Sequence, residues 1–168
     1  MLLRSLTNDR ESDVLLPLCN GKTAEIGCGY RKVHPNNIGV DMCGPGELGK
    51  AGNVKGKASV ADHKALGDDL WMFKTGELDA MVAKHVLEHF DDPMKTLLEW
   101  KRVVRKGGKI GVIVPNDKYV DTMTLDPTHK QRFTHVSLIR LFTDAGLKVL
   151  DGGDCIRHWS LYIIAEKR

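Results

Sequence analysis

Short apolar runs alternate with segments of helical periodicity from Thr23 to the end of the chain, and this alternation constrains the fold more than any other feature. Strands that alternate with helical crossovers form a mostly parallel sheet. The sequence therefore predicts an α/β fold with seven strands, whose ends are approximate by about two to four residues. The expected strands span Thr23–Gly27, Asn37–Asp41, Lys57–Val60, Leu78–Ala83, Lys109–Val114, Leu147–Asp151 and Ser160–Ala165.

Two helices are predicted from their end signals. One spans Pro93–Arg105, because an aspartate of the pair before it can cap the helix and proline suits the first turn. The other begins at His135 or Val136 and ends at Ala145, with Gly146 at the stop position. The segment Pro115–Thr134 lacks clean periodicity, and a connection of that length in a compact domain is usually functional.

The length of 168 residues predicts a single domain that spans 1–168. No apolar run approaches the length of about 20 residues that crosses a bilayer, so we expect no membrane association. Charged residues within Met1–Asp13 interrupt any signal-peptide core, which predicts a cytoplasmic protein. The same segment shows no sign of an N-terminal helical extension.

Charge and cysteine content argue against several classes of site. The net charge of +3 is far from a concentrated basic face, so nucleic-acid binding is not indicated. The four cysteines form no CxxC pair, which argues against a zinc ribbon and a disulfide framework. We expect reduced thiols and no bound metal.

The segment Ala24–Gly29 places a buried strand directly before a pair of glycines. Open parallel sheets bind ligands at this carboxyl edge, and glycines let backbone amides approach the ligand. Asp41 closes the next apolar run, where a carboxylate can accept hydrogen bonds from both hydroxyls of a ribose. These features predict a site for a nucleoside-containing ligand.

A nicotinamide cofactor is an alternative that the same residues disfavour. Dinucleotide-binding loops follow the pattern G-x-G-x-x-G, whereas Lys32 stands at the third glycine position. Their acidic residue lies about 20 residues further on, but Asp41 follows Gly27 after 14. The segment Tyr30–Asn36 is also too short for a full crossover helix, so we expect a loop there.

Five motifs together resemble, in their order along the chain, the class I S-adenosylmethionine-dependent methyltransferases. More narrowly, the chain resembles a group of small methyltransferases (methyltransferase type 11-like) in which a short loop replaces the first crossover helix. The resemblance implies a Rossmann-like class I methyltransferase fold, a mostly parallel seven-stranded sheet with helices on both faces. The motifs are Glu25–Gly29, Asn37–Asp41, His85–Phe90, Arg102–Gly108 and Val114-Pro115, followed by Asp126–Lys130 and Phe133-Thr134.

The resemblance also implies roles for particular residues. S-adenosylmethionine would be the methyl donor and S-adenosylhomocysteine the product, with the ribose at Asp41. Asp62 would meet the adenine amino group, and Lys84 and His85 would face the sulfonium end. The full set of implied donor-binding residues is Glu25, Gly27, Cys28, Gly29, Asp41, Met42, Ala61, Asp62, Lys84 and His85.

The segment His85–His89 also fits the H-x-x-E-H pattern of a class of zinc peptidases. That pattern needs a long helix and a distant third ligand, whereas here it follows a strand and is soon closed by Pro93. A structural role for Glu88 and His89, capping or bracing the start of the next helix, is favoured over zinc binding. His85 is the member that we place in the pocket.

The acceptor side is expected in the segment Pro115–Thr134, with His129 as the candidate catalytic base and His85 beside it. The alternative for His129 and His135 is that both are surface residues without a catalytic role. The acceptor is expected to be a small molecule or a saccharide, because some members of the group that the chain resembles are associated with cell-surface polysaccharide. An alternative is a non-catalytic domain that binds S-adenosylmethionine or a partner, and the sequence leaves the oligomeric state open.

Overall fold

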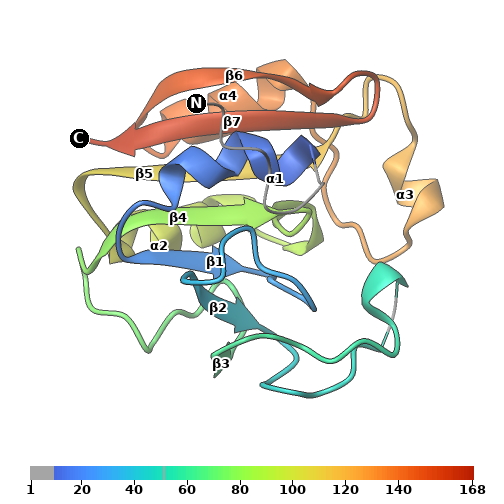
Figure 1. The fold of residues 1–168 in the computed structure, drawn as a ribbon. Helices are drawn as coiled ribbons and strands as arrows, with labels where there is room; N and C mark the ends of the chain where they lie inside the picture. The colour runs from blue at the N-terminus through green and yellow to red at the C-terminus, as the bar shows by residue number, and fades with distance from the viewer. Residues whose placement is uncertain (1–9, 51) are drawn as a thin grey trace, which may run out of the picture.

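A computed structural model describes residues 10–50 and 52–168 of the chain. Its seven strands form one sheet in the order β3-β2-β1-β4-β5-β7-β6 (Figure 1). The expectation that the first residues hold no signal peptide falls mostly on residues 1–9, which lie outside the described residues. The predicted fold class, a mostly parallel sheet with helices, is confirmed.

Six of the seven predicted strands occur close to their expected positions. The apolar runs that predicted them are buried, as in β4, where Met81, Val82 and Ala83 are fully inaccessible to solvent. The strands are β1 (Thr23–Ile26), β2 (Ile38–Asp41), β3 (His63–Lys64), β4 (Leu78–Lys84), β5 (Val104–Pro115), β6 (Leu147–Ile156) and β7 (Ser160–Lys167).

Strand direction determines where the site can form. The five neighbouring strands β3, β2, β1, β4 and β5 pair in parallel. Strand β7 runs antiparallel to both of its neighbours, β5 and β6. The carboxyl ends of β1, β2 and β4 therefore meet at one edge, where parallel sheets bind ligands.

The third predicted strand was wrong. Lys57–Val60 does not join the sheet, because its backbone bonds to an earlier segment, with Gly49 N–H donating to Lys57 O and Ser59 N–H donating to Glu47 O. The strand at this sheet edge is instead the two-residue β3, which pairs with Val40 and Asp41.

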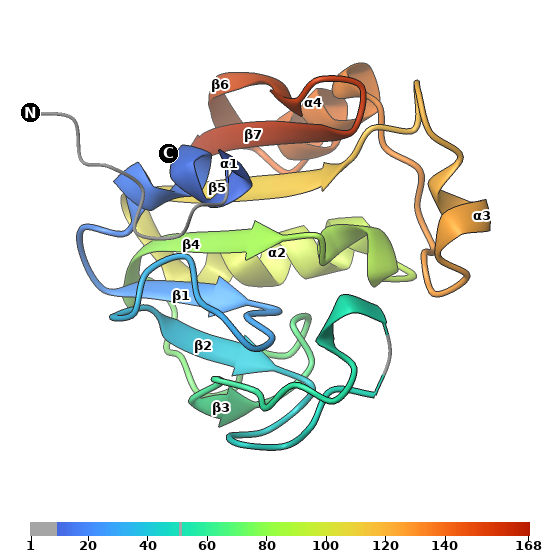
Figure 2. The ribbon, with the colours of Figure 1, turned by 45° about the vertical axis from the view of Figure 1, so that its right-hand side comes forward.

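Helices α2 (Pro93–Val103) and α4 (His135–Asp144) cover one face of the sheet (Figures 1 and 2). Asp92 caps α2 by accepting a 2.9 Å hydrogen bond from Lys95 N–H, as the sequence predicted for this pair of aspartates. A capping box of Thr134 and Ser137 begins α4. Both helices match their predicted positions to within two residues.

The opposite face is covered by the short helix α1 (Arg10–Leu15), drawn in front of β4 and β5 in Figures 1 and 2. A 3₁₀ turn, η1 (Leu16–Leu18), follows it. The side chain of Leu15 packs with Val82 and Ile113 in a second, smaller hydrophobic cluster. The expectation of no N-terminal helical segment was therefore wrong, because six residues with few apolar side chains leave little periodic signal.

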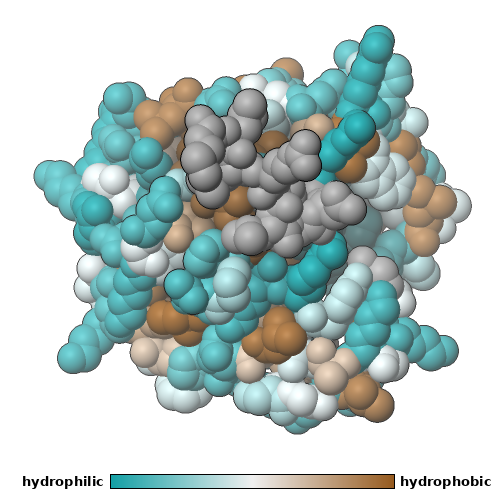
Figure 3. Space-filling model, viewed as in Figure 1, coloured by the Kyte–Doolittle hydropathy of each residue, from teal (hydrophilic) through white to brown (hydrophobic). Residues whose placement is uncertain are grey.

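The remaining elements are short and lie in the connections. The segment 116–134 contains α3 (Thr122–Leu125), and the 3₁₀ turns η2 (Gly52–Val54) and η3 (Leu87–His89) follow β2 and β4. Crossover 30–37 is a loop, as predicted. Figure 3 shows mostly hydrophilic side chains on the α1 side, with small apolar patches scattered between them. Within the described ranges, none of the helices has the length and apolar character needed to cross a membrane.

Candidate functional site

The turn after β1 presents two glycines in the left-handed region, Gly27 with φ of 68° and Gly29 with φ of 55°. Glycine adopts this conformation at little cost. A Cβ on Gly27 would also overlap the side chain of Val86, which follows β4. The backbone turn is therefore tightly packed and requires glycine at position 27.

Asp41 ends β2 beside this turn. Its Oδ2 accepts a 2.9 Å hydrogen bond from Gly29 N–H, and its Oδ1 accepts one of 2.9 Å from Cys43 N–H. An ionised carboxylate offers about four acceptor positions, so the two hydrogen bonds leave room for ligand hydroxyls. Met42, the next residue, is 69% exposed.

A small hollow of about 10 Å³ lies beside Asp41. Ligand pockets usually measure about 300–1,000 Å³, so a bound nucleoside would have to displace part of the wall or extend over the open surface. The residues that line the hollow are Gly29, Asp41, Cys43, Gly49, Val54, Lys57 and Ser59.

Asp62 lies between β2 and β3, directly after the buried Ala61. Its carboxylate accepts a 2.7 Å hydrogen bond from Gly39 N–H and a 2.6 Å bond from the Lys32 ammonium group. Burial acts to raise the pKa of Asp62, but Lys32 and the Gly39 N–H outweigh it and lower the pKa below its ordinary value. The residue is thus an ionised acceptor that already holds the crossover loop.

Glu25 is buried, with 3% of its surface exposed, in the middle of β1. Its carboxylate accepts hydrogen bonds of 2.9 and 2.8 Å from Val33 N–H and one of 2.9 Å from the Asn37 side-chain amide. Burial raises the pKa of Glu25 to about 7. In this structure Glu25 fastens the loop that replaces the first crossover helix.

Cys28, between the two glycines of the turn, is 5% exposed. Burial, with the neighbouring Asp41 carboxylate, raises the pKa of the Cys28 thiol to about 12. The thiol is therefore protonated at neutral pH and packs as a small apolar group.

Lys84 and His85, at the end of β4, both turn toward α1. The Lys84 ammonium donates to Ser12 Oγ at 3.0 Å, and His85 Nε2 lies 3.0 Å from Glu11 Oε1. Burial acts to lower the pKa of His85, but the hydrogen bond to Glu11 and the neighbouring Glu88 carboxylate raise it to about 9. His85 also has a φ of 54°, in a region that non-glycine residues seldom adopt. The end of β4 thus carries a cationic imidazole held by a helix that was not predicted.

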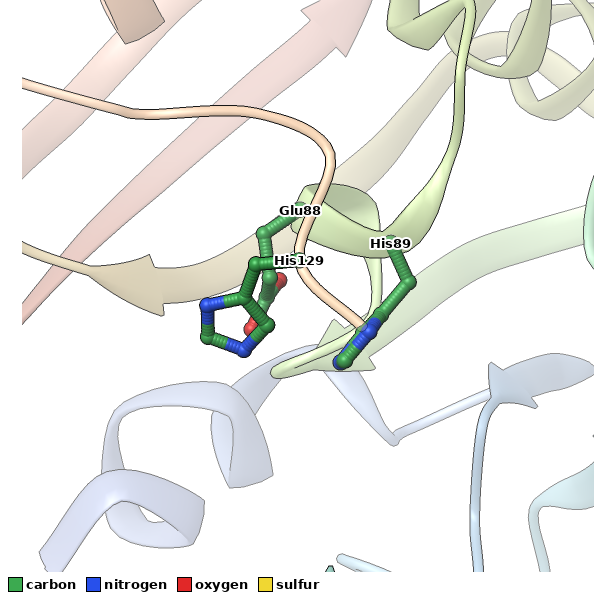
Figure 4. Close-up of side chains that lie close together, drawn as sticks. All are labelled: Glu88, His89 and His129. Carbon is green, nitrogen blue, oxygen red and sulfur yellow. The ribbon is translucent and has the colours of Figure 1, made fainter. Parts of the chain in front are cut away.

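His129 lies in the segment 116–134 and meets Glu88 and His89 of η3 (Figure 4). The segment His85–His89 forms no long helix, as we expected when we set the zinc-peptidase pattern aside, because η3 is a three-residue 3₁₀ turn. Of the expectation that Glu88 and His89 cap or brace the start of the next helix, the capping role is wrong, because Asp92 caps α2.

The structure sorts the predicted residues into three groups. Gly29 lies with Asp41, Lys84 and His85 lie with α1, and His129 lies with Glu88 and His89. Glu11, which sequence reasoning missed, is 8% exposed and accepts a 2.6 Å hydrogen bond from Ser160 Oγ as well as contacting His85. An acidic residue in a short polar helix carries no signal of such burial.

Residues 24–112, more than half of the chain, match the family model described as "Methyltransferase domain". The protein MJ1123 of Methanocaldococcus jannaschii is 33% identical over 115 residues, which cover 67% of this chain. The chain spans about half, 54%, of the length of that relative.

Solved structures agree in fold at low sequence identity. A chain of the complex between the Haloferax volcanii Trm112 methyltransferase activator and a methyltransferase is 16% identical, with a TM-score of 0.71 over 94% of this chain and 88% of that one. Geranyl diphosphate methyltransferase in complex with S-adenosylmethionine is 13% identical, with a TM-score of 0.67 over 94% of this chain and 84% of that one. With the family match and the order of its seven strands, the chain belongs to the S-adenosylmethionine-dependent class I methyltransferases.

Proposed function

We propose that the protein transfers a methyl group from S-adenosylmethionine to a small-molecule acceptor. The observation that carries the proposal is the hydrogen bond of 2.9 Å between Gly29 N–H and the Asp41 carboxylate, at the carboxyl edge of a parallel sheet. It brings a carboxylate acceptor for ribose hydroxyls beside a glycine turn whose backbone is accessible to a ligand.

The donor site that we propose extends from this pair along the sheet edge. Asp41 would hold the ribose and Asp62 the adenine amino group, with Met42 against the adenine ring. Gly27, Cys28 and Gly29 would approach the methionine part through their backbone, and Ala61 would pack under the purine. Glu25 would shape the turn from below, through its hydrogen bonds to the crossover loop.

The chemistry asks little of the protein beyond alignment. S-adenosylmethionine, when bound, supplies a methyl group on a positively charged sulfur, which an acceptor atom displaces in line. The residues at the edge must orient the two molecules and exclude water, and orientation can be worth about 7–11 kcal/mol. At the end of β4, the Lys84 ammonium group donates a hydrogen bond to the Ser12 hydroxyl of α1.

The segment 116–134 would form the acceptor side of the pocket. It leaves the sheet after β5, at the same edge as Gly29 and Asp41. His129 would take the proton of an acceptor hydroxyl, since its side chain is 10% exposed and its Nδ1 has no hydrogen-bond partner among the described residues. Saccharide hydroxyls are the acceptors that we would examine first.

The proposal is tested by incubating the protein with labelled S-adenosylmethionine and a panel of hydroxylated metabolites, monosaccharides and glycans. We expect acceptor-dependent formation of S-adenosylhomocysteine and a labelled product, both lost in Asp41→Ala. A protein that binds the donor but methylates no class of acceptor would contradict methyl transfer.

A further inference from the structure

Glu88, His89 and His129 form a cluster outside the glycine turn. One ring nitrogen of each histidine and one carboxylate oxygen of Glu88 all lie within 4.8 Å of one another. Figure 4 shows the two imidazole rings, one from η3 and one from the segment 116–134, with the Glu88 carboxylate beside the His129 ring. Three metal-ligating side chains thus converge from two segments that are far apart in the sequence.

The Glu88 carboxylate is buried without a hydrogen bond from the described part of the chain. Glu88 is 1% exposed, and neither Oε1 nor Oε2 has a hydrogen-bond partner among the described residues. His85 Nδ1 lies 3.5 Å from Oε1, a distance at which the cationic imidazole forms an ion pair with Glu88 but no good hydrogen bond. A buried carboxylate without hydrogen bonds is costly, and such groups are usually paired or coordinate a metal.

His129 shows the same lack of partners. Its Nδ1 is buried without a hydrogen-bond partner in the described part of the chain, and its Nε2 lies 3.7 Å from Asp126 Oδ2. Carboxylates at the outer side of metal-bound histidines orient the ring. Asp126 is held in place by accepting hydrogen bonds of 2.9 Å and 2.6 Å from the Thr128 N–H and hydroxyl.

The backbone keeps the two segments in register. Lys130 N–H and Gln131 N–H both donate to Glu88 O, at 2.7 and 3.0 Å, and the Gln131 side-chain amide donates to Phe90 O at 3.1 Å. His89 Nδ1 lies 3.1 Å from the Thr128 hydroxyl and 3.3 Å from Thr128 O. Because a carbonyl oxygen only accepts, donation from Nδ1 leaves the lone pair of a neutral His89 ring on Nε2, available to a metal.

We propose that Glu88, His89 and His129 bind a divalent transition metal ion of the Zn²⁺ class. Two histidines and one carboxylate are a ligand set for such ions, and three protein ligands leave a coordination position open for water or a substrate oxygen. With metal–ligand bonds of about 2.0–2.2 Å, the ligand atoms around a tetrahedral ion lie about 3.3–3.6 Å apart. The ligand atoms of the cluster, which lie within 4.8 Å of one another, therefore have to approach by up to about 1.5 Å, through rotation of the side chains.

The site differs from the peptidase pattern in the sequence. It uses Glu88 and His89, the glutamate and the second histidine of H-x-x-E-H, and takes its third ligand from the segment 116–134, while His85 stays with Glu11. A ring nitrogen that binds the metal cannot accept a proton at the same time. In the metal-bound protein His129 is a ligand, and a base role belongs only to the metal-free form.

Equilibrium dialysis of the metal-free protein against Zn²⁺ and Co²⁺ tests the site without any methyl donor or acceptor. We expect one equivalent to bind, and the affinity to fall more than about 10-fold in Glu88→Gln, His89→Gln and His129→Gln, since even an outer-shell partner is worth about 10–100-fold. His158→Gln removes an exposed histidine of the β6–β7 turn and should bind as the wild type does.

Circular dichroism of each variant separates loss of the site from loss of the fold. His89 is only half-buried, so His89→Gln is the substitution least disruptive to packing. The Co²⁺ absorption spectrum should lack a thiolate charge-transfer band, because the ligands are nitrogen and oxygen. No stoichiometric binding, binding unchanged in folded His89→Gln and His129→Gln, or a thiolate band from one of the four cysteines would each overturn the proposal.

Discussion

Gly29 N–H donates a 2.9 Å hydrogen bond to Oδ2 of Asp41, so the glycine turn after β1 and the end of β2 form one unit. A ligand that contacts the backbone of the turn therefore lies beside the Asp41 carboxylate. The same bond also holds Asp41 in position in the absence of a ligand.

Asp41→Ala should weaken binding of S-adenosylhomocysteine. Each lost hydrogen bond to a charged acceptor costs about 1.5–3 kcal/mol, which is about 10-fold to more than 100-fold in dissociation constant. Asp144→Ala, which removes an exposed carboxylate from α4, is the control and should bind as the wild type does. Unchanged affinity in a folded Asp41→Ala would place the ribose elsewhere.

Gly27→Ala should destabilise the protein through two separable effects. The left-handed conformation costs alanine about 1–2 kcal/mol, and overlap with Val86 adds about 1–3 kcal/mol. Urea denaturation should show a smaller cost of Gly27→Ala in a Val86→Ala background, where only the conformational part remains. Equal costs in the two backgrounds would show that Val86 does not constrain the turn.

Glu25 should make stability fall as the pH rises. Its pKa is about 7 in the fold against an ordinary 4.5, so the native state binds more protons than the unfolded state between these values. The contribution of Glu25 to the free energy of unfolding is therefore fully present below pH 4.5 and is lost as the pH rises through 7. The loss amounts to about 3 kcal/mol at most.

Glu25→Gln removes this titration while keeping an acceptor for Val33 N–H. Urea denaturation at pH 5 and pH 8 should show the variant gaining stability relative to the wild type at the higher pH. Glu166→Gln on β7 controls for the removal of one carboxylate from a strand. If the difference in unfolding free energy between wild type and variant were the same at pH 5 and pH 8, Glu25 would be ionised in the fold at both pH values, against the prediction.

His129→Ala should leave S-adenosylhomocysteine affinity unchanged and lower methyl transfer, by about 10²–10⁴-fold if the residue acts as a base. His129 lies with Glu88 and His89 and not with Asp41, so loss of its side chain should spare the donor site. Parallel assays of donor affinity and turnover, with His158→Gln as control, check this. Full turnover in the variant would exclude His129 from the chemistry.

Local sequence patterns predicted most of the sheet but not the edge strand β3. Buried strands such as β4 are continuous apolar runs, and Asp41 closes the apolar run of β2, so the position of the proposed ribose-binding carboxylate at a strand end could be predicted from the sequence. The two-residue β3 has no such pattern. It is held by backbone pairing with β2, whereas the more strand-like Lys57–Val60 bonds to residues 46–49.

The proposed acceptor side depends on contacts that no local pattern encodes. Glu88 and His129 meet because Lys130 N–H and Gln131 N–H bond to Glu88 O, across about forty residues of chain. Likewise, the partner of His85 is Glu11 on a six-residue helix. Both depend on tertiary packing, which overrides weak local propensity.

Titration calorimetry of the wild-type protein with S-adenosylhomocysteine and, separately, with NAD tests the donor site most directly. We predict that S-adenosylhomocysteine binds with one-to-one stoichiometry, more weakly in Asp41→Ala, and that NAD gives no heat of binding. Binding of NAD, or no binding of S-adenosylhomocysteine by the folded protein, would contradict the donor site at Gly29 and Asp41.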